Sequence, residues 1–209
     1  VMQSLSPDLA ELPTLSSAEI EHPTATFTVL RRKPIIGSHW AILCQQQHAE
    51  AIHRHLLTIG TSYGLTPAGS LTYNTLRIRS GRPAGQELST DYIPLEVGLW
   101  NEVSFNKGCY TGQEIIARME SRQRLAKALV KIQLSQFIEA PATVYMDNKA
   151  VGTMTSSVQA PDDNIFANAV LKMDATQPNT SLTVGEQHIN ATVMGYAGEQ
   201  PAFITGESS

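Results

Sequence analysis

The spacing of apolar residues predicts two strands and a helix in the first third of the chain. Thr26–Leu30 alternates and is rich in β-branched residues, and Trp40–Cys44 is a short apolar run typical of a central strand. Between Gln45 and Ile59 apolar residues recur every three or four positions, which predicts a helix that ends at Gly60. Residues 1–24 are interrupted by prolines and are predicted to be irregular.

The middle of the chain has a weaker pattern. Leu71–Arg79 favours a helix or a helix-to-strand transition, and periodicity alone does not decide between them. Glycines and a proline between Gly81 and Gly85 predict a loop, and Leu88–Leu99 is predicted to be extended and irregular. After Gly112 apolar residues return at helical spacing, so a further helix is expected there.

From Lys127 onward the pattern changes to short alternating segments. Val130, Ile132 and Leu134 alternate with polar residues, as in a strand with one buried face. Further strand-like segments follow at regular spacing: Ala142–Met146, Ala150–Thr155, Ile165–Lys172, Leu182–Val184 and His188–Val193. This arrangement predicts a small antiparallel barrel or sandwich. The end of the chain, from Gly195, is expected to be a flexible tail.

Length and charge narrow the class of protein. A chain of 209 residues can bury a core and is expected to form one or two domains. A net charge of −4 argues against strong, non-specific nucleic-acid binding, although a local basic patch stays open. No apolar run approaches the ~20 residues that a membrane-spanning helix needs, and no membrane partner is expected.

The cysteines and histidines do not predict a metal site. Cys44 and Cys109 lack metal-ligand spacing, and two cysteines do not make a disulfide framework, so a reducing compartment such as the cytoplasm is expected. Cys44 lies inside an apolar run and is predicted to be a core residue. The histidines of the predicted helix, at positions 48, 53 and 55, lack the i, i+4 spacing that places two imidazoles on one metal.

The segment from Lys107 to Glu114, with the sequence KGCYTGQE, is the strongest candidate for chemistry. Cys109 lies on a predicted tight loop with a glycine on either side, and a helix is expected to begin just after it. A lysine two residues away and a helix N-terminus both favour thiolate over thiol, which makes a cysteine reactive. The alternative is a small buried hydrophobic residue, and the sequence leaves both open.

This octapeptide resembles the signature of the YgfZ family, which is related to the glycine-cleavage T-protein, an aminomethyltransferase. The resemblance covers about residues 71–130. It rests also on Leu76-Arg77-Ile78, Ser80-Gly81-Arg82-Pro83, Gly85-Gln86-Glu87, Pro94-Leu95-Glu96, Ser104-Phe105 and Ala117-Arg118.

The resemblance implies an α+β fold in which the C-terminal part of a T-protein-like α/β domain is followed by a small antiparallel β-barrel. The expected domains are 1–125, 126–196 for the barrel, and a tail over 197–209. Family members carry a further N-terminal portion, and this chain begins with Val1, so it is expected to be a fragment or a processed form. If a transit peptide is missing, an organellar matrix or stroma replaces the cytoplasm as the expected location.

The resemblance also implies the site residues. The candidate catalytic residues are Cys109, the functional cysteine of the family motif, and Lys107, which an extended loop would place on the same side. The candidate folate-binding residues are Tyr73, Arg77, Tyr110, Gln113, Glu114 and Arg118. Three of these residues have a structural alternative: Tyr73 and Tyr110 can simply pack in the core, and Glu114 can stabilise the start of a helix.

Two further arginine features bear on the ligand. Arg118, Arg122, Arg124 and Lys127 form a basic cluster, which is either a solvated face or a site for phosphate or the glutamate tail of a folate. Arg79 stands where T-proteins carry the acid that holds the pterin ring, and an arginine cannot accept hydrogen bonds. Either another acid takes this role or pterin recognition is lost.

Three functions follow as hypotheses. The favoured one is a tetrahydrofolate-linked accessory protein for iron–sulfur cluster assembly or repair, which supports cluster-dependent enzymes such as those that modify tRNA and uses Cys109. Its partners would be iron–sulfur enzymes or assembly factors. The second is a folate-dependent aminomethyl or one-carbon transferase, and the third is a binding module in which Cys109 is merely buried.

Overall fold

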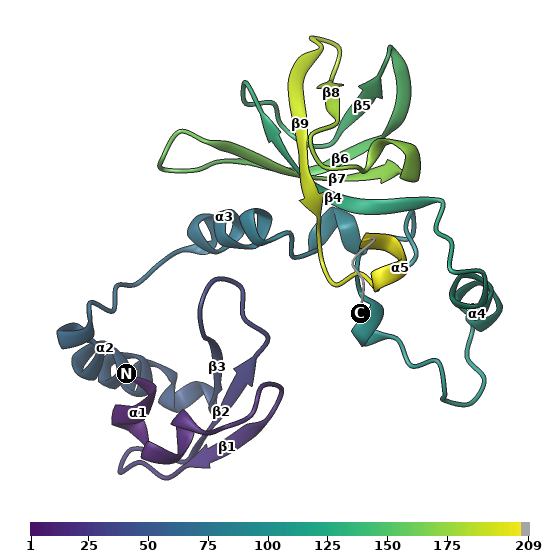
Figure 1. The fold of residues 1–209 in the computed structure, drawn as a ribbon. Helices are drawn as coiled ribbons and strands as arrows, with labels where there is room; N and C mark the ends of the chain where they lie inside the picture. The colour runs from purple at the N-terminus through teal and green to yellow at the C-terminus, as the bar shows by residue number, and fades with distance from the viewer. Residues whose placement is uncertain (206–209) are drawn as a thin grey trace. The chain divides into compact units, whose positions relative to one another are not determined.

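The computed structural model describes residues 1–205, and the chain divides by its contacts into two units between Tyr73 and Asn74 (Figure 1). The sequence predicts a boundary after residue 125 instead. The segment that begins at Asn74 groups with the barrel because its buried side chains share a core with barrel strands. Val97, for example, packs with Leu129 and Val170.

The first unit contains a three-stranded antiparallel sheet of β1 (Ser17–Ile20), β2 (Phe27–Arg32) and β3 (His39–Leu43), in that order. Both predicted strands are present, and residues 17–20, which were expected to be irregular, form a third. The prediction that the apolar run at Trp40–Cys44 is central is wrong, because β2 is the central strand. Leu43, at the end of the edge strand β3, is 59% exposed.

Short helices complete the first unit: α1 (Met2–Leu5), η1 (Pro7–Ala10), η2 (Gln46–His48), α2 (Ala49–Gly60) and η3 (Thr61–Tyr63). The predicted helix is present and α2 ends at Gly60, as expected, but Gly60 keeps a helical backbone conformation and is not the left-handed C-cap. The chain continues into η3, and the left-handed residue that stops it is Gly64, with φ of 72°. Cys44 is half-buried against the core of this unit rather than fully inside it.

Helix α3 (Ser70–Ser80) crosses from the first unit into the second, which settles the open choice for this segment in favour of a helix. The second unit then contains η4 (Gly85–Leu88), η5 (Trp100–Glu102) and α4 (Gln113–Arg122) before its first strand. Within residues 1–205, no helix combines the length and apolar character needed to cross a membrane.

Six strands of the second unit close into an antiparallel barrel in the order β4-β7-β6-β5-β8-β9 (Figure 1). They are β4 (Lys127–Leu134), β5 (Ala142–Met146), β6 (Lys149–Gln159), β7 (Ile165–Lys172), β8 (Ser181–Val184) and β9 (Ile189–Tyr196), with η6 (Met173–Ala175) between β7 and β8. The alternating residues of each strand fill the interior; Ile132, Met154 and Leu171 are completely buried there. The predicted α+β class and the small antiparallel barrel are confirmed.

The chain after β9 returns to the segment before the barrel. Leu99 and Glu199 form an isolated parallel bridge, and α5 (Ala202–Thr205) places Ile204 in a buried cluster with Leu95 and Ile116. These residues differ from the flexible tail predicted for 197–209, because they bury apolar side chains. Residues 206–209 of that predicted tail lie outside the described residues.

Candidate functional site

The motif segment forms a loop between η5 and α4, as the sequence predicts. Gly112 adopts the left-handed conformation, with φ of 86°, and its carbonyl accepts hydrogen bonds from the amides of Ile115 and Ile116. A residue with a Cβ atom is strained at such a φ, so glycine suits this turn. The turn starts α4 immediately after the motif cysteine.

Cys109 is a free thiol exposed on this loop, whereas Cys44 is half-buried. Its neighbours Lys107 and Gly108 are exposed as well. The alternative prediction, that Cys109 is a buried hydrophobic residue, is therefore wrong. An exposed thiol can meet a partner or a reagent without unfolding of the chain.

Lys107 and Tyr110 interact across Cys109. The Nζ atom of Lys107 lies 5.2 Å from the centroid of the Tyr110 ring, within the range of a cation–π contact. Tyr110 is half-buried and packs against the cluster that contains Ile116. The core thus anchors Tyr110, and the Tyr110 ring in turn positions the lysine charge on the thiol loop.

The loop borders a hollow of about 430 Å³. Its apolar side is formed by Ile93, Pro94, Val103, Ile115 and Ile116, and its polar side by Glu102, Ser104, Lys107, Tyr110 and Thr111. Cys109 lies between two of these lining residues, two positions after Lys107 and directly before Tyr110. The hollow therefore offers apolar surface, hydroxyl groups, a cation and a carboxylate beside an exposed thiol.

The two other motif residues predicted to bind a ligand serve the start of α4. The amide of Gln113 donates to the carbonyl of Tyr110, and its side chain is half-buried. Glu114 is exposed in the first turn of α4, where a negative charge is favourable to the helix dipole. This position agrees with the structural alternative for Glu114.

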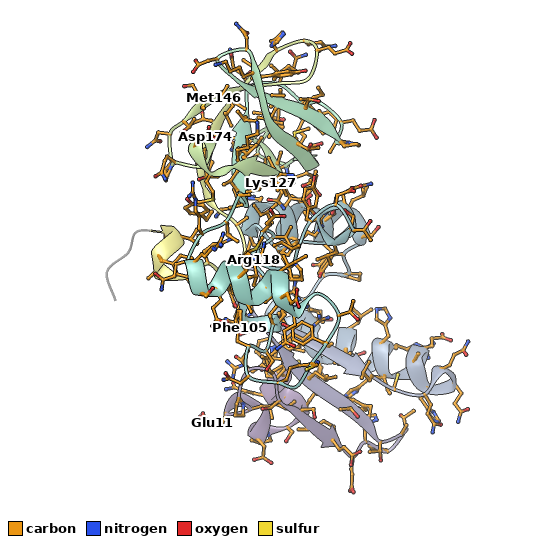
Figure 2. The ribbon with its side chains drawn as sticks, turned by 90° about the vertical axis from the view of Figure 1, so that its right-hand side faces the viewer. Glu11, Phe105, Arg118, Lys127, Met146 and Asp174 are labelled. Atoms are coloured by element: carbon orange, nitrogen blue, oxygen red, sulfur yellow. The ribbon has the colours of Figure 1, made fainter. Side chains whose placement is uncertain are left out.

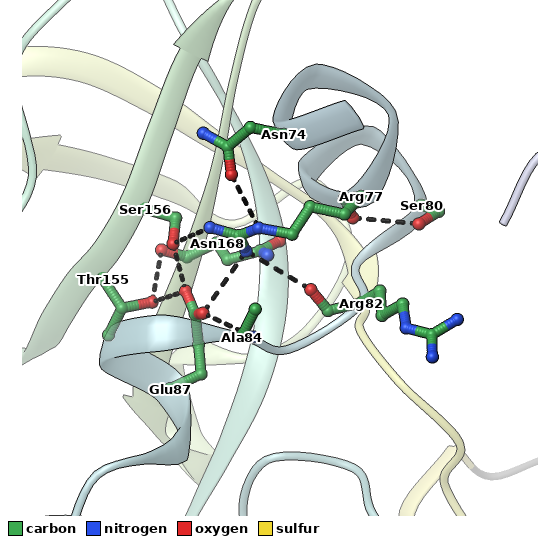
Figure 3. Close-up of polar contacts among 9 residues, drawn as sticks. All are labelled: Asn74, Arg77, Ser80, Arg82, Ala84, Glu87, Thr155, Ser156 and Asn168. Carbon is green, nitrogen blue, oxygen red and sulfur yellow. Dashed lines mark hydrogen bonds and ion pairs between the residues drawn. The ribbon is translucent and has the colours of Figure 1, made fainter. Parts of the chain in front are cut away.

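Arg77 lies in a buried polar network with partners on η4 and β6 (Figure 3). Its Nη1 atom is 3.4 Å from a carboxylate oxygen of Glu87, whose side chain is completely buried, and its Nη2 donates to Ser156. Glu87 also accepts hydrogen bonds from Thr155, from Ser156 and from the amide of Ala84. A buried carboxylate is tolerated here because an arginine and three donors surround it.

This network joins α3 and η4 to strand β6 of the barrel. Asn168 on β7 is completely buried beside it, and neither side-chain polar atom has a hydrogen-bond partner in the part of the chain that the structure describes (Figure 3). The sequence analysis did not assign a role to Glu87 or Ser156. Their pairing links positions far apart in the chain, and no local motif signals it.

The remaining predicted residues lie elsewhere. Tyr73 ends the first unit, 44% exposed, with its ring centroid 6.5 Å from that of His39. Arg79 pairs with Asp162 on the β6–β7 turn at 3.6 Å. A hydrogen bond from Asn164 lowers the pKa of the Asp162 carboxyl, and Arg79 contributes to the same shift. Arg79 thus faces an acid of the barrel.

The predicted basic cluster divides in the structure. Arg118, Arg122 and Arg124 line a second hollow together with Lys172, which the sequence analysis did not identify. Lys127 is separate from them, with its Nζ 6.0 Å from the Tyr92 ring centroid. In Figure 2, Arg118 lies on α4. Within residues 1–205, no group of three or more His, Cys, Asp or Glu side chains is placed to hold a metal ion.

Comparison with known proteins finds sequence relatives among transferases. No protein-family model matches the chain. A chloroplastic protein of Arabidopsis thaliana, provisionally named a transferase, is 38% identical over 140 residues, which make up 66% of this chain and 31% of that protein. The aminomethyltransferase of Caldanaerobacter subterraneus is 32% identical over 123 residues, or 57% of this chain and 33% of the enzyme. The chain spans about a third of the length of these two relatives.

A solved structure extends the similarity to the fold. Aminomethyltransferase T of the glycine cleavage system from Bartonella henselae matches with a TM-score of 0.74 over 93% of this chain and 58% of that chain, at 17% sequence identity. At this identity the match shows the fold alone. The chain therefore has the fold of part of aminomethyltransferase T, as the family resemblance implies, and aminomethyltransferases are among its sequence relatives.

Proposed function

We propose that this chain is part of a YgfZ-like, folate-linked accessory protein for iron–sulfur cluster assembly or repair, in which Cys109 supplies the working thiolate. The observation that carries the proposal is the placement of Cys109. It is exposed on a glycine-bounded loop beside a hollow, at the start of α4. The motif that resembles the YgfZ signature is thus the part of the second unit that carries an exposed thiol.

A single exposed thiolate suits transient contact with a cluster. Iron–sulfur clusters are normally held by several cysteine thiolates, and this chain has two cysteines, one of them half-buried. Cys109 can therefore contribute one ligand to a cluster held mainly by a partner. In this proposal the cluster is cargo or substrate, and the partner is an iron–sulfur enzyme or assembly factor, for example one that modifies tRNA.

The hollow beside the loop fits part of a reduced folate. Its volume of about 430 Å³ falls within the ~300–1,000 Å³ typical of small-molecule sites. Glu102, in its lining, has a carboxylate that can accept hydrogen bonds from a pterin. Arg79 cannot do this, because a guanidinium group only donates. Tyr110 and the isoleucines supply apolar contact. A bound tetrahydrofolate would supply one-carbon or redox chemistry next to the thiol.

A folate-dependent aminomethyl transferase is the second candidate. The sequence similarity to aminomethyltransferases favours it. Transfer also requires a carboxylate that assists the reaction, and the family resemblance places that group in the N-terminal portion, outside this chain. Formation of methylene-tetrahydrofolate from an aminomethyl donor by the protein would support this candidate over the accessory role.

We propose the cellular location of the protein from its relatives. The Arabidopsis relative is chloroplastic, which supports the organellar alternative to the cytoplasm. Both compartments suit a protein that works through a reduced thiol.

Rescue of cluster-dependent enzymes tests the accessory role. Cells that lack the endogenous protein would receive the wild-type gene or a Cys109→Ser variant, and the activity of several iron–sulfur enzymes would be measured. The proposal predicts that Cys109→Ser gives no rescue at normal protein levels, because the hydroxyl cannot replace a thiolate ligand. Full rescue by Cys109→Ser would exclude the proposed role of the thiol.

Cys44→Ser provides the matched control for this experiment. Cys44 is the other cysteine and is half-buried in the first unit, where no role is proposed for its thiol. It should rescue as the wild type does. Equal loss in both variants would mean that serine substitution harms folding, and immunoblots of soluble protein would separate that effect from loss of function.

A further inference from the structure

The second hollow is basic in a chain that is acidic overall. Arg118, Arg122, Arg124 and Lys172 line it, with Asp174 as the single acid, so its lining carries four cations and one anion, a net +3, against −4 for the whole chain. In Figure 2, Arg118 lies on α4 and Asp174 on the barrel. The charges come from two stretches of sequence, α4 with the loop after it and the end of β7 with η6.

A solvated surface is the simpler explanation, but it accounts for only part of the cluster. Arg122 is in the last turn of α4, where a cation stabilises the helix dipole. Arg118 and Arg122 are four residues apart on the helix, and like charges at this spacing destabilise it. Neither arginine, nor Arg124, forms an ion pair with any residue between 1 and 205. The chain thus maintains unneutralised charge at this hollow.

The floor of the hollow is apolar. Met119, Leu125 and Met173 line it and belong to the same core cluster as Ile116, and Leu125 is only 3% exposed. Methionine side chains adapt to ligands of different shape. The volume is about 630 Å³, again in the ~300–1,000 Å³ range of small-molecule sites.

We propose that this hollow binds an organic oxyanion: an apolar or aromatic body rests on Met119, Leu125 and Met173, and phosphate or carboxylate groups meet the arginines. The planar guanidinium group matches the geometry of both oxyanions and binds them with paired hydrogen bonds. The site is separate from the thiol loop. The two hollows have no lining residue in common, although α4 contributes Ile115 and Ile116 to the one beside the thiol loop and Arg118, Met119 and Arg122 to the basic one.

Calorimetric titration of the whole chain tests this site with three probes at matched ionic strength. 4-Nitrophenyl phosphate and benzoyl-glutamate each combine an aromatic body with an oxyanion, and inorganic phosphate lacks the body. The proposal predicts that at least one organic probe binds about tenfold more tightly than inorganic phosphate, since the floor adds apolar burial. The preferred organic probe identifies the oxyanion as phosphate or carboxylate. Equal binding of all three probes, or binding of none at millimolar concentration, would overturn the proposal.

Substitutions assign the binding to the arginines. Arg124→Gln should weaken the preferred probe about tenfold, and Arg118→Gln with Arg124→Gln should weaken it further, because each lost pair removes a charge-assisted hydrogen bond. Arg32→Gln is the control, since Arg32 is exposed on β2 outside the hollow. Wild-type binding in the double variant, or equal weakening by Arg32→Gln, would contradict the site. Circular dichroism of each variant checks the fold, and no cluster-dependent partner is needed, so the outcome is independent of the proposed function.

Discussion

Cys109 and Cys44 differ in solvent access, which is one of the properties that decide the reactivity of a thiol. Cys109 is exposed on the motif loop, and Cys44 is half-buried against the core of the first unit. Lys107, held against the Tyr110 ring, places a positive charge on the same loop. These features make Cys109 the residue on which the proposed chemistry depends.

Alkylation at neutral pH should distinguish the two thiols. We expect iodoacetamide to label Cys109 in the folded protein at least about tenfold faster than Cys44, since burial shields a thiol from reagents. Mass spectrometry of peptides taken over time measures both rates in one sample. Equal rates in the folded protein would contradict the difference in access, and equal rates in urea provide the control.

Glu87 is a single residue whose buried ion pair is expected to stabilise the second unit. Its carboxylate is completely buried and meets Arg77 at 3.4 Å. Glu87→Gln removes the charge and leaves the arginine buried without its counter-ion, which should lower the free energy of unfolding by ~3 kcal/mol. Urea denaturation of the two proteins measures this difference.

Glu50→Gln is the matched control for Glu87→Gln. Glu50 pairs with Arg54 at 2.5 Å, but their side chains are 85% and 73% exposed, so water already solvates both charges. We expect a change below ~0.5 kcal/mol. A similar loss of stability in both variants would mean that burial of the Arg77–Glu87 pair has no special weight.

For single residues, the sequence predicts interactions between neighbouring positions better than contacts between positions far apart in the chain. The glycine-bounded loop around Cys109 and the helix after Gly112 could be predicted because their signals lie within a few residues. The Arg77–Glu87–Ser156 network could not, since Ser156 lies 69 positions beyond Glu87. The place of Lys172 in the basic hollow could not be predicted either, because the fold of the barrel brings this residue near arginines that are distant in the sequence.

Among the elements, the contact between the C-terminal segment and the segment before the barrel depends on close backbone approach. Gly98 has φ of 75°, and a Cβ atom there would lie 2.7 Å from the carbonyl oxygen of Ala197. The bridge between Leu99 and Glu199 follows directly. Both glycine's conformational freedom and its missing side chain are therefore needed at this position.

Gly98→Ala should destabilise the second unit by a left-handed strain of ~1–2 kcal/mol plus ~1–3 kcal/mol for the clash with fixed backbone. Gly85→Ala is the control: its φ is also positive, at 51°, but no atom lies within 4 Å of the added Cβ. Thermal unfolding measures both. A Gly98→Ala protein no less stable than Gly85→Ala would show that the two segments separate without cost.

The strands also differ in how well the sequence predicts them. The barrel strands could be predicted because one residue in two faces a closed interior, as Val130, Ile132 and Leu134 do. Strand β1 could not, because it is four residues long and only Ile20 is buried. An apolar run also suggested a central position for β3, yet only one face of this edge strand packs against the core, through Trp40 and Ile42, and Leu43 on the other face is exposed.

For the whole molecule, the division between Tyr73 and Asn74 indicates that the second unit carries its own core. A shortened chain of residues 66–209, which keeps α3 intact, should therefore fold cooperatively with barrel packing unchanged. Amide chemical shifts of the barrel residues, compared with those of the full chain, measure this. A collapsed spectrum without dispersed signals would contradict the independence of the second unit.

The proposed function joins an exposed, reactive Cys109 to a reduced folate in the hollow beside it. Its most direct test is the alkylation rate of Cys109 with and without saturating folinate, a stable reduced folate, with Cys44 as the internal reference. We predict that folinate slows labelling of Cys109 several-fold and leaves Cys44 unchanged, because Lys107 and Tyr110 on either side of the thiol line the hollow. An unchanged Cys109 rate, or equal slowing of both cysteines, would contradict a folate site at the motif loop.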